Sequence, residues 1–480
     1  MENKRVLGNF IWRFLERSGA QIVQFIVSII LARLLDPELY GTVAIVTAIT
    51  TIMQVFITSG LGTALVQKKD SDDVDFSTVF YFNVVMCLVV YAVMFFAAPL
   101  IAMLYDMPEL TPIVRVLSLT LVISGVRNIQ HSYVSKHMLF KNFFFSTIGG
   151  TIASAIVGIA MAYAGFGVWA LVGQQISNIL IGTVVLWFTV KWRPKWKFSF
   201  DSLKTLFSFG WKLLVSSLID SVYNEIRTFV IGAKYSSADL AFYDKGKKFP
   251  NLIVQNVNTS IDSVLLPVLA KEQDNRERVK AMTRRAIKTS TYIMMPLMMG
   301  LAVCAEPVVR LLLTEKWMGC VLFMRVFCFT YAFYPIHTAN LNAIKAMGRS
   351  DLFLKMEILK KVVGLAAVFI SMWFGVEWMA YSLLITTFIS QAVNAYPNKK
   401  LLGYSYGQQM MDMLPQIILS CVMGAVVFCI QFIGLNDILT LLIQVPLGAV
   451  IYIVGSYLFK LDSFSYVLNM LKGFLRKKKQ

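Results

Sequence analysis

The sequence has few charged residues and few histidines for its length. Only 15% of its 480 residues are Asp, Glu, Lys or Arg, and 57% are hydrophobic. Soluble domains average about 25% charged and about 45–50% apolar residues. The shortage of charge therefore excludes an ordinary soluble protein, and no polar stretch is long enough for a separate soluble domain. The composition predicts an all-α polytopic membrane protein.

Residues that carry enzyme chemistry or bind metals are equally scarce. The three histidines are scattered, and His131 and His137 fall in a basic loop, so a zinc cluster is not expected. The six cysteines lie in or beside apolar segments without paired metal spacing, which is typical of small core residues. No Walker A sequence and no Ser/His/Asp arrangement stands out. We therefore expect no enzyme activity, no cofactor and no metal site.

One acidic motif has the form that glycosyltransferases use to hold a metal and a nucleotide sugar. It is Asp73-Val74-Asp75, in a short loop between two apolar runs. No strand–helix–strand pattern surrounds it. We therefore expect Asp70, Asp72, Asp73 and Asp75 to form a solvated turn.

About fourteen apolar runs are long enough to cross a bilayer, which needs roughly 20 helical residues. The first is too long for the core of a signal peptide, so we expect it to remain as an uncleaved anchor. The predicted spans are residues 9–34, 41–66, 78–104, 112–130, 146–164, 167–190, 211–233, 249–270, 287–313, 318–344, 354–374, 376–396, 414–433 and 438–459.

The chain looks doubled, with six spans before Trp196 and six more before Tyr396. Since each set has an even number of spans, both sets begin on the same side, as in parallel repeats. We predict an N-terminal six-helix lobe at 1–200, a C-terminal six-helix lobe at 201–400, and two further spans within 401–460.

The last segment, 461–480, is predicted to be a basic amphipathic tail. An apolar face is opposed by Lys472 and followed by four more cations; its members are Phe464, Val467, Leu468, Leu471 and Leu475. A helix of this kind suits the anionic cytoplasmic leaflet.

The net charge of +18 resides mostly in short loops between spans, which is a topology signal of membrane proteins and argues against nucleic-acid binding. The loops alternate between the two sides of the membrane, and the basic ones, such as 191–197 and 271–285, fall on the same side as both termini. Positively charged loops face the cytoplasm, so we expect a multi-pass protein of the inner (cytoplasmic) membrane with both termini in the cytoplasm. Lys234, Lys245, Lys247 and Lys248 violate this rule on the outer side. An anion site and an aromatic-basic anchor both remain open explanations.

Polar residues, some of them charged, recur on one face of two spans. Asp220, Asn224 and Arg227 do so within 211–233, and Asn258 and Asp262 do so within 249–270. A charge near the bilayer centre costs about 2.5–3.5 kcal/mol even on a lenient scale, so these side chains should avoid lipid.

The first half repeats the pattern. Arg13, Arg17 and Gln21 lie on the first span and Gln54 on the second, while Lys245 and Lys248 come just before the eighth. We interpret these residues as lining a wet cavity for substrate. The alternative is that they only join helices by hydrogen bonds or ion pairs.

Several short stretches carry a resemblance to a known family over the whole chain. They are Ala32-Arg33-Leu34-Leu35-Asp36-Pro37-Glu38-Leu39-Tyr40-Gly41, Asp239-Leu240-Ala241-Phe242-Tyr243, Pro250-Asn251-Leu252 with Val257-Asn258, Glu306-Pro307-Val308-Val309-Arg310-Leu311-Leu312 and Ala346-Met347-Gly348-Arg349-Ser350-Asp351. The sequence resembles the Wzx-type polysaccharide (lipid-linked oligosaccharide) flippases of the MOP exporter superfamily, which also includes MATE drug exporters and the lipid II flippase MurJ.

The resemblance implies a two-lobed transporter of twelve to fourteen helices with a central cationic cavity lined by spans one, two, seven and eight. It implies that an undecaprenyl-pyrophosphate-linked oligosaccharide moves to the outer leaflet by alternating access. Its partners would be this lipid-linked oligosaccharide, membrane lipids, and the polymerase and glycosyltransferases of the same pathway. Many relatives carry Asp near the position of Arg227, so the Arg puts an Asp-based cation site there in doubt.

Two other functions stay open at this stage. A MATE-like cation-coupled drug exporter would need a carboxylate-rich, aromatic cavity, yet the polar stripes hold at least as many Arg as acidic residues. A membrane glycosyltransferase or polymerase usually needs a large outer loop or a cytoplasmic domain, and the sequence offers neither.

Overall fold

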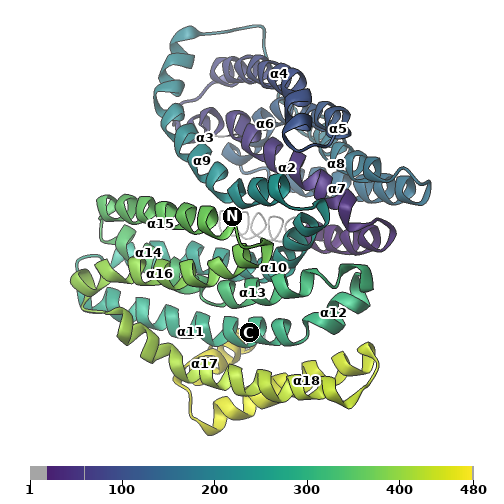
Figure 1. The fold of residues 1–480 in the computed structure, drawn as a ribbon. Helices are drawn as coiled ribbons and strands as arrows, with labels where there is room; N and C mark the ends of the chain where they lie inside the picture. Colours follow the sequence, from purple (N-terminus) through teal and green to yellow (C-terminus); the bar gives the residue numbers. More distant parts are fainter. Residues whose placement is uncertain (1–18, 59, 478–480) are drawn as a thin grey trace. The chain divides into compact units, whose positions relative to one another are not determined.

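The structure is a computed structural model that describes residues 19–58 and 60–477. The described residues form helices, turns and loops, with no strand among them. They divide into two compact units, Met1–Ala241 and Phe242–Gln480. We treat each unit by itself, and Figure 1 labels the helices of both.

Unit 1 contains a first helix described as Gly19–Leu34 and eight more helices. These are α2 (Pro37–Thr58), α3 (Leu61–Gln67), α4 (Asp73–Leu104), α5 (Leu110–Leu117), α6 (Leu119–Lys136), α7 (Phe140–Tyr163), α8 (Val168–Thr189) and α9 (Phe200–Lys234). The long helices α7 and α8 lie side by side as a hairpin (Figure 1).

Helix α10 (Ser237–Lys271) begins in unit 1 and continues into unit 2. The remaining elements are α11 (Arg276–Val303), α12 (Ala305–Leu312), the 3-10 turn η1 (Glu315–Trp317), α13 (Cys320–Ala332), α14 (Tyr334–Ala346), α15 (Ser350–Ser371), α16 (Val376–Leu402), α17 (Tyr406–Cys429), the 3-10 turn η2 (Ile430–Ile433), α18 (Asp437–Leu458) and α19 (Asp462–Lys477).

The predicted all-α polytopic fold is confirmed. Ten helical segments of the described chain are long and apolar enough to cross a membrane. Helices α9, α15 and α16 are 35, 22 and 27 residues long, which also suffices for a span. With the first helix they are consistent with the fourteen predicted spans. The division into lobes at residue 200 stays a prediction.

Two boundaries differ from the prediction. The span predicted at 41–66 is two helices, because α2 ends at Thr58 and α3 begins at Leu61 after Gly60, whose φ of 103° favours glycine. The basic cluster predicted to precede the eighth span lies inside a helix, because α10 already begins at Ser237. The polar first turns of α10 hide its start in a hydropathy profile.

Helix α9 packs along α2 and α3 in unit 1. A Cβ added to Gly210 would lie 3.0 Å from the carbonyl carbon of Gly60, and one added to Gly232 would lie 3.0 Å from Cγ1 of Ile45. The N-terminal part of α9 thus meets the end of α2, and its C-terminal part meets the start of α2. The two helices therefore run antiparallel, with glycines allowing close approach.

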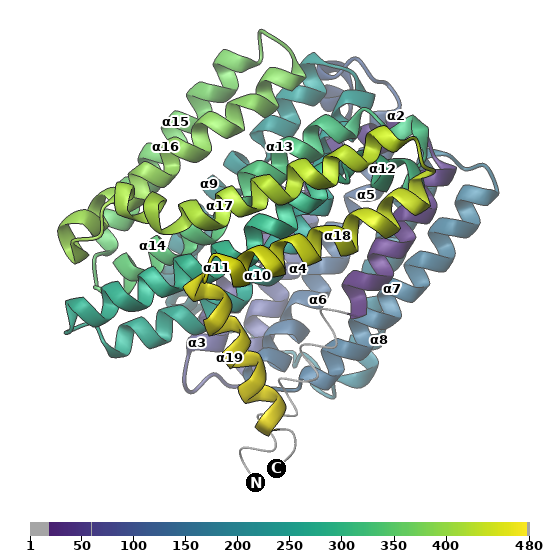
Figure 2. The same ribbon diagram turned by 90° about the horizontal axis from the view of Figure 1, so that it is seen from below.

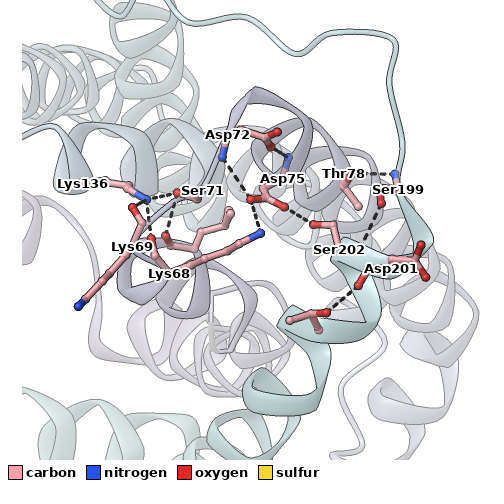
Figure 3. Close-up of polar contacts among 12 residues, drawn as sticks. Lys68, Lys69, Ser71, Asp72, Asp75, Thr78, Lys136, Ser199, Asp201 and Ser202 are labelled. Atoms are coloured by element: carbon pink, nitrogen blue, oxygen red, sulfur yellow. Dashed lines mark hydrogen bonds and ion pairs between the residues drawn. The ribbon is translucent and has the colours of Figure 1, made fainter.

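The loop between α3 and α4 is held by a buried carboxylate, Asp75, which is 4% exposed. Its Oδ2 accepts from Lys68 Nζ at 2.6 Å and from the Asp72 amide at 3.2 Å, and its Oδ1 accepts from Ser202 Oγ of α9 (Figure 3). Asp72 in turn caps α4 by accepting from the Asp75 amide at 2.8 Å. The expected solvated turn is therefore wrong for Asp75, because distant residues fold over it.

Other side chains tie the same loop to neighbouring segments. Lys136 Nζ donates to the Lys68 carbonyl at 2.6 Å and also to Ser71 Oγ. The Ser199 amide donates to Thr78 Oγ1 at 3.0 Å (Figure 3). This end of unit 1 is thus fastened by polar contacts that link α4, α6 and α9.

Unit 2 contains a fully buried amide cluster where α14, α16 and α17 meet. Asn340 and Gln409 exchange two side-chain hydrogen bonds of 2.8 and 3.0 Å. Asn398 Nδ2 donates to Asn340 Oδ1 at 2.7 Å, and Asn394 lies 2.8 Å from His337 Nδ1. Buried amides paired in this way fix helix register, since a shifted helix would leave them unpaired.

Next to this cluster an ion pair joins α11 to α17. The Arg284 guanidinium contacts both Asp412 oxygens at 2.6 Å, and the Tyr404 hydroxyl donates to Asp412 at 2.8 Å. Burial, followed by this hydrogen bond, raises the pKa of the Tyr404 phenol well above its usual value. Tyr404 therefore stays protonated as a donor to the carboxylate.

The C-terminal part of unit 2 is the α17–α18 hairpin, with α19 leading away from the end of α18 (Figure 2). Tyr292 of α11 donates to Ser456 Oγ at 3.1 Å and accepts from Tyr452 at its carbonyl at 2.9 Å. Tyr292 and Tyr452 belong to an apolar cluster, and Phe464 and Val467 of α19 pack against it. Part of the apolar face predicted for the tail is thus covered by the protein itself.

We expect Asp75→Ala to lower the thermal stability of the purified protein. The substitution removes the shared acceptor of Lys68, Ser202 and the Asp72 amide, and a buried hydrogen-bonding group left unpaired costs about 1–3 kcal/mol. Thermal unfolding in detergent measures the change. Asp70→Ala, at an exposed position of the same loop, is the matched control, and an equal melting temperature for both variants would contradict this role of Asp75.

We expect Gly41→Ala to reduce the amount of folded protein. Its Cβ would lie 1.8 Å from the Ser237 carbonyl oxygen, a backbone atom that has no rotamer by which to retreat. Overpacking of this kind typically costs about 1–3 kcal/mol. Gly300→Ala is the control, because no atom lies within 4 Å of its added Cβ. Size-exclusion chromatography of fluorescent fusions compares them; equal monodisperse yields would refute the close approach.

Candidate functional site

The residues predicted on the first two spans lie only partly within the described structure. Arg13 and Arg17 fall outside the described residues. Gln21 and Gln54 are half-buried in unit 1. The threonines beside Gln54 are satisfied locally, since Thr51 Oγ1 donates to the Thr47 carbonyl at 2.7 Å and Thr58 Oγ1 to the Gln54 carbonyl at 3.0 Å. Hydrogen bonds from a threonine hydroxyl to the carbonyl four residues earlier are common within helices and do not indicate a ligand.

The predicted residues of α9 share one face of that helix. Asp220 and Arg227 are seven residues apart, which places them about 10 Å apart along the axis and nearly in line. Asp220 and Asn224 are exposed, and Arg227 is half-buried. This face differs from the one that Gly210 and Gly232 turn to α2 and α3. Unit 1 therefore carries both signs of charge on a side of α9 other than its glycine face.

The two predicted lysines of α10 have different surroundings. Lys245 is 3% exposed, and its Nζ lies 5.1 Å from the ring centroid of the buried Trp317, a cation–π contact within unit 2. Lys248 is exposed. Of the two, Lys248 is the one that a ligand reaches without rearrangement of the unit.

The remaining predicted residues lie farther along α10. Asn258 is half-buried and Asp262 is exposed. The Asn258 Oδ1 atom is itself buried and makes no hydrogen bond to the described residues. These two positions, like Lys245 and Lys248, belong to unit 2.

The buried amide cluster of unit 2 was not found from the sequence. A signal was present, because Gln391, Asn394 and Asn398 recur at spacings of three and four on α16. All three are fully buried, as are Asn340 and Gln409. Asn340, Asn398 and Gln409 bond to one another, Asn394 contacts His337, and Gln391 accepts from Tyr406. These contacts indicate a scaffold that fixes the helices of unit 2.

The chemistry available to the α9 and α10 faces is binding. In the described part of the chain no group of three His, Cys, Asp or Glu side chains is placed to hold a metal ion. An exposed Asp and a half-buried Arg on one helix that is long enough to span a membrane can bind a charged or hydroxyl-rich ligand through hydrogen bonds and charge.

Comparison with known proteins identifies the family. Residues 30–322, more than half of the chain, match the family described as "Polysaccharide biosynthesis protein". The chain is 25% identical over 315 residues to the succinoglycan biosynthesis transport protein ExoT of Rhizobium meliloti, covering 65% of this chain and 64% of that protein. It is 24% identical to the teichuronic acid biosynthesis protein TuaB of Bacillus subtilis (84% and 85% covered) and 23% identical to the lipopolysaccharide biosynthesis protein WzxC of Escherichia coli (85% of each).

Solved structures share the fold at lower identity. The lipid II flippase MurJ in an inward closed conformation superimposes with a TM-score of 0.75 at 17% identity, covering 94% of this chain and 98% of that one. An inward-facing multidrug resistance MATE family transporter of the MOP superfamily gives 0.62 at 14% identity, covering 80% and 94%.

The predicted resemblance to Wzx-type proteins is confirmed by these matches together. The family match carries it, and the two superpositions show that the helices follow the MOP arrangement. The chain belongs to the polysaccharide biosynthesis protein family and has the fold of the MOP superfamily of membrane transporters.

Proposed function

We propose that this protein moves a lipid-linked oligosaccharide across the cytoplasmic membrane for the synthesis of a surface polysaccharide. The observation that carries the proposal is the charged face of α9, Asp220 with Arg227, on a helix of 35 residues in a chain of this family. Charged groups in a span mark substrate or ion pathways far more often than lipid contacts.

The substrate that fits this face is an anion with a sugar attached. Arginine binds phosphate through a planar fork of donors, and lysine acts as a point charge. We assign Arg227 to the pyrophosphate of an undecaprenyl-pyrophosphate carrier, with Asp220 and Asn224 offering hydrogen bonds to sugar hydroxyls. Lys248, Asn258 and Asp262 of α10 are further candidates, as are Arg13, Arg17, Gln21 and Gln54. Lys245 ranks below Lys248 because it already packs against Trp317.

The same charges supply a means of alternating access. If Arg227 contacts phosphate in one state and a carboxylate in another, the carboxylate competes with the substrate. The substrate then has different affinities for the two states, and only such a difference can shift the equilibrium between them. Asp220 is not the carboxylate that we assign to Arg227, because the two residues lie two turns apart on one helix.

Deletion in a native host tests the function. The mutant should lose one surface polysaccharide and accumulate its lipid-linked repeat unit inside the cell, as measured by glycan analysis and by mass spectrometry of extracted lipids. Unchanged export of every surface polysaccharide by the mutant would contradict the proposal. If overexpression instead raised resistance to cationic drugs, the MATE-like alternative would replace it.

Substitution of Arg227 tests the site. At equal membrane abundance we expect Arg227→Ala to abolish export and Arg227→Lys to retain part of it, because lysine keeps the charge but loses the fork. Lys204→Ala removes one cation from the start of the same helix, away from the charged face, and should export normally. Normal export by Arg227→Ala, or a loss explained by protein abundance alone, would show that Arg227 is structural.

A further inference from the structure

A basic pocket in unit 2 is lined by none of the residues on the charged faces of α9 and α10. It has a volume of about 710 Å³ and lies between the N-terminal half of α11 and the start of α19. Four cations line it: Lys280, Arg284, Arg285 and Lys288. Lys280, Arg284 and Lys288 follow at intervals of four residues, so they share one face of α11.

Contacts within unit 2 hold several of these cations in place. Arg284 is fixed by its two contacts of 2.6 Å to Asp412. Lys288 pairs with Asp462 at the first residue of α19, at 3.0 Å. The Arg285 guanidinium lies 5.2 Å from the ring centroid of Tyr466 on α19. The pocket is thus a preorganised cationic site that both helices build.

The balance of charge in the pocket is positive. Its lining includes two carboxylates, Glu277 and Asp462, against the four cations. Asp462 is already paired with Lys288 and Asp412 with Arg284, so Lys280 and Arg285 remain against Glu277. Arginine and lysine side chains gathered in this way suit a phosphate group, and a pocket of this volume can hold more than a bare ion.

The pocket lies at one end of three membrane-spanning helices. The charged first turns of α11 line it, α17 begins nearby and supplies Asp412, and α18 ends at Leu458, four residues before α19 begins. Tyr457, Leu458 and Phe459 beside this end are 71%, 68% and 73% exposed. Such a mixture of cations and exposed apolar side chains is typical of the headgroup level of a bilayer.

We propose that this pocket binds the phosphate of an anionic phospholipid and so fastens α19 to α11 at the membrane surface. The cations receive the phosphate, and the exposed apolar side chains at the end of α18 accompany the acyl chains. We assign this lipid as a bound component of the protein and not as the transported substrate, because the pocket is lined by residues of α11 and α19 and by none of the substrate-binding candidates on α9 and α10. A soluble phosphate compound could contact the same cations, but it has no acyl chain to pack against the apolar side chains at the end of α18.

The test is lipid binding by the full-length purified protein. Native mass spectrometry and thermal unfolding are compared in mixtures of phosphatidylglycerol and phosphatidylcholine. We expect phosphatidylglycerol to bind preferentially and to raise the melting temperature. Lys280→Gln/Arg285→Gln should weaken this binding roughly thirty-fold, as expected for two cations lost near a lipid surface. An unchanged melting temperature in pure phosphatidylcholine shows that the variant folds.

Lys271→Gln/Arg276→Gln is the matched control. It removes two exposed cations near the same end of α11 that do not line the pocket. It should bind phosphatidylglycerol like the unmodified protein. Equal loss in both double variants would overturn the proposal in favour of general charge attraction. Stabilisation by millimolar glycerol phosphate without lipid, lost in Lys280→Gln/Arg285→Gln, would overturn the assignment to a lipid.

Discussion

The structure depends on one constraint: a polar group inside a largely apolar helical protein must find a partner or water. Within hydrocarbon each unsatisfied polar group costs several kcal/mol. The two units meet this constraint with networks near helix ends. Asp75 gathers Lys68, Asp72 and Ser202 in unit 1, and Asp412 gathers Arg284 and Tyr404 in unit 2. Each network joins segments far apart in the sequence, so satisfying the carboxylate also fixes the helices around it.

The polar groups that these networks leave accessible are informative about function. The charged face of α9 lies about a quarter turn around the helix from the glycines with which it packs on α2 and α3. Asp220 and Arg227 lie outside the glycine contacts of α9, whereas Asn340 and Gln409 pair with each other inside unit 2. We therefore assign Asn340 and Gln409 to the scaffold and propose Asp220 and Arg227 as ligand-binding residues. Lys245, which lies against Trp317, belongs with the first group.

The basic pocket of α11 and α19 extends the same principle to the membrane surface. Cations there are oriented by Asp412, Asp462 and Tyr466, yet the pocket retains a positive balance. A bound anionic lipid would complete it, just as protein carboxylates complete the networks in the interior. The C-terminal helix would then be held by both apolar packing, through Phe464 and Val467, and a shared headgroup.

The sequence by itself determined the class of fold and the long helices. Runs of about 20 apolar residues leave no alternative in a bilayer, and the stripe of Asp220, Asn224 and Arg227 was visible because helical periodicity is local. Tertiary structure decided what local patterns do not contain. The local sequence predicted a solvated Asp75, but Ser202 of α9 binds this carboxylate and helps to bury it. The hydropathy of the sequence likewise did not indicate the start of α10, because the first turns of this helix are polar. Whether a polar side chain pairs inside the protein or faces outward depends on neighbours that can lie more than a hundred residues away in the sequence, and only the folded chain brings these together.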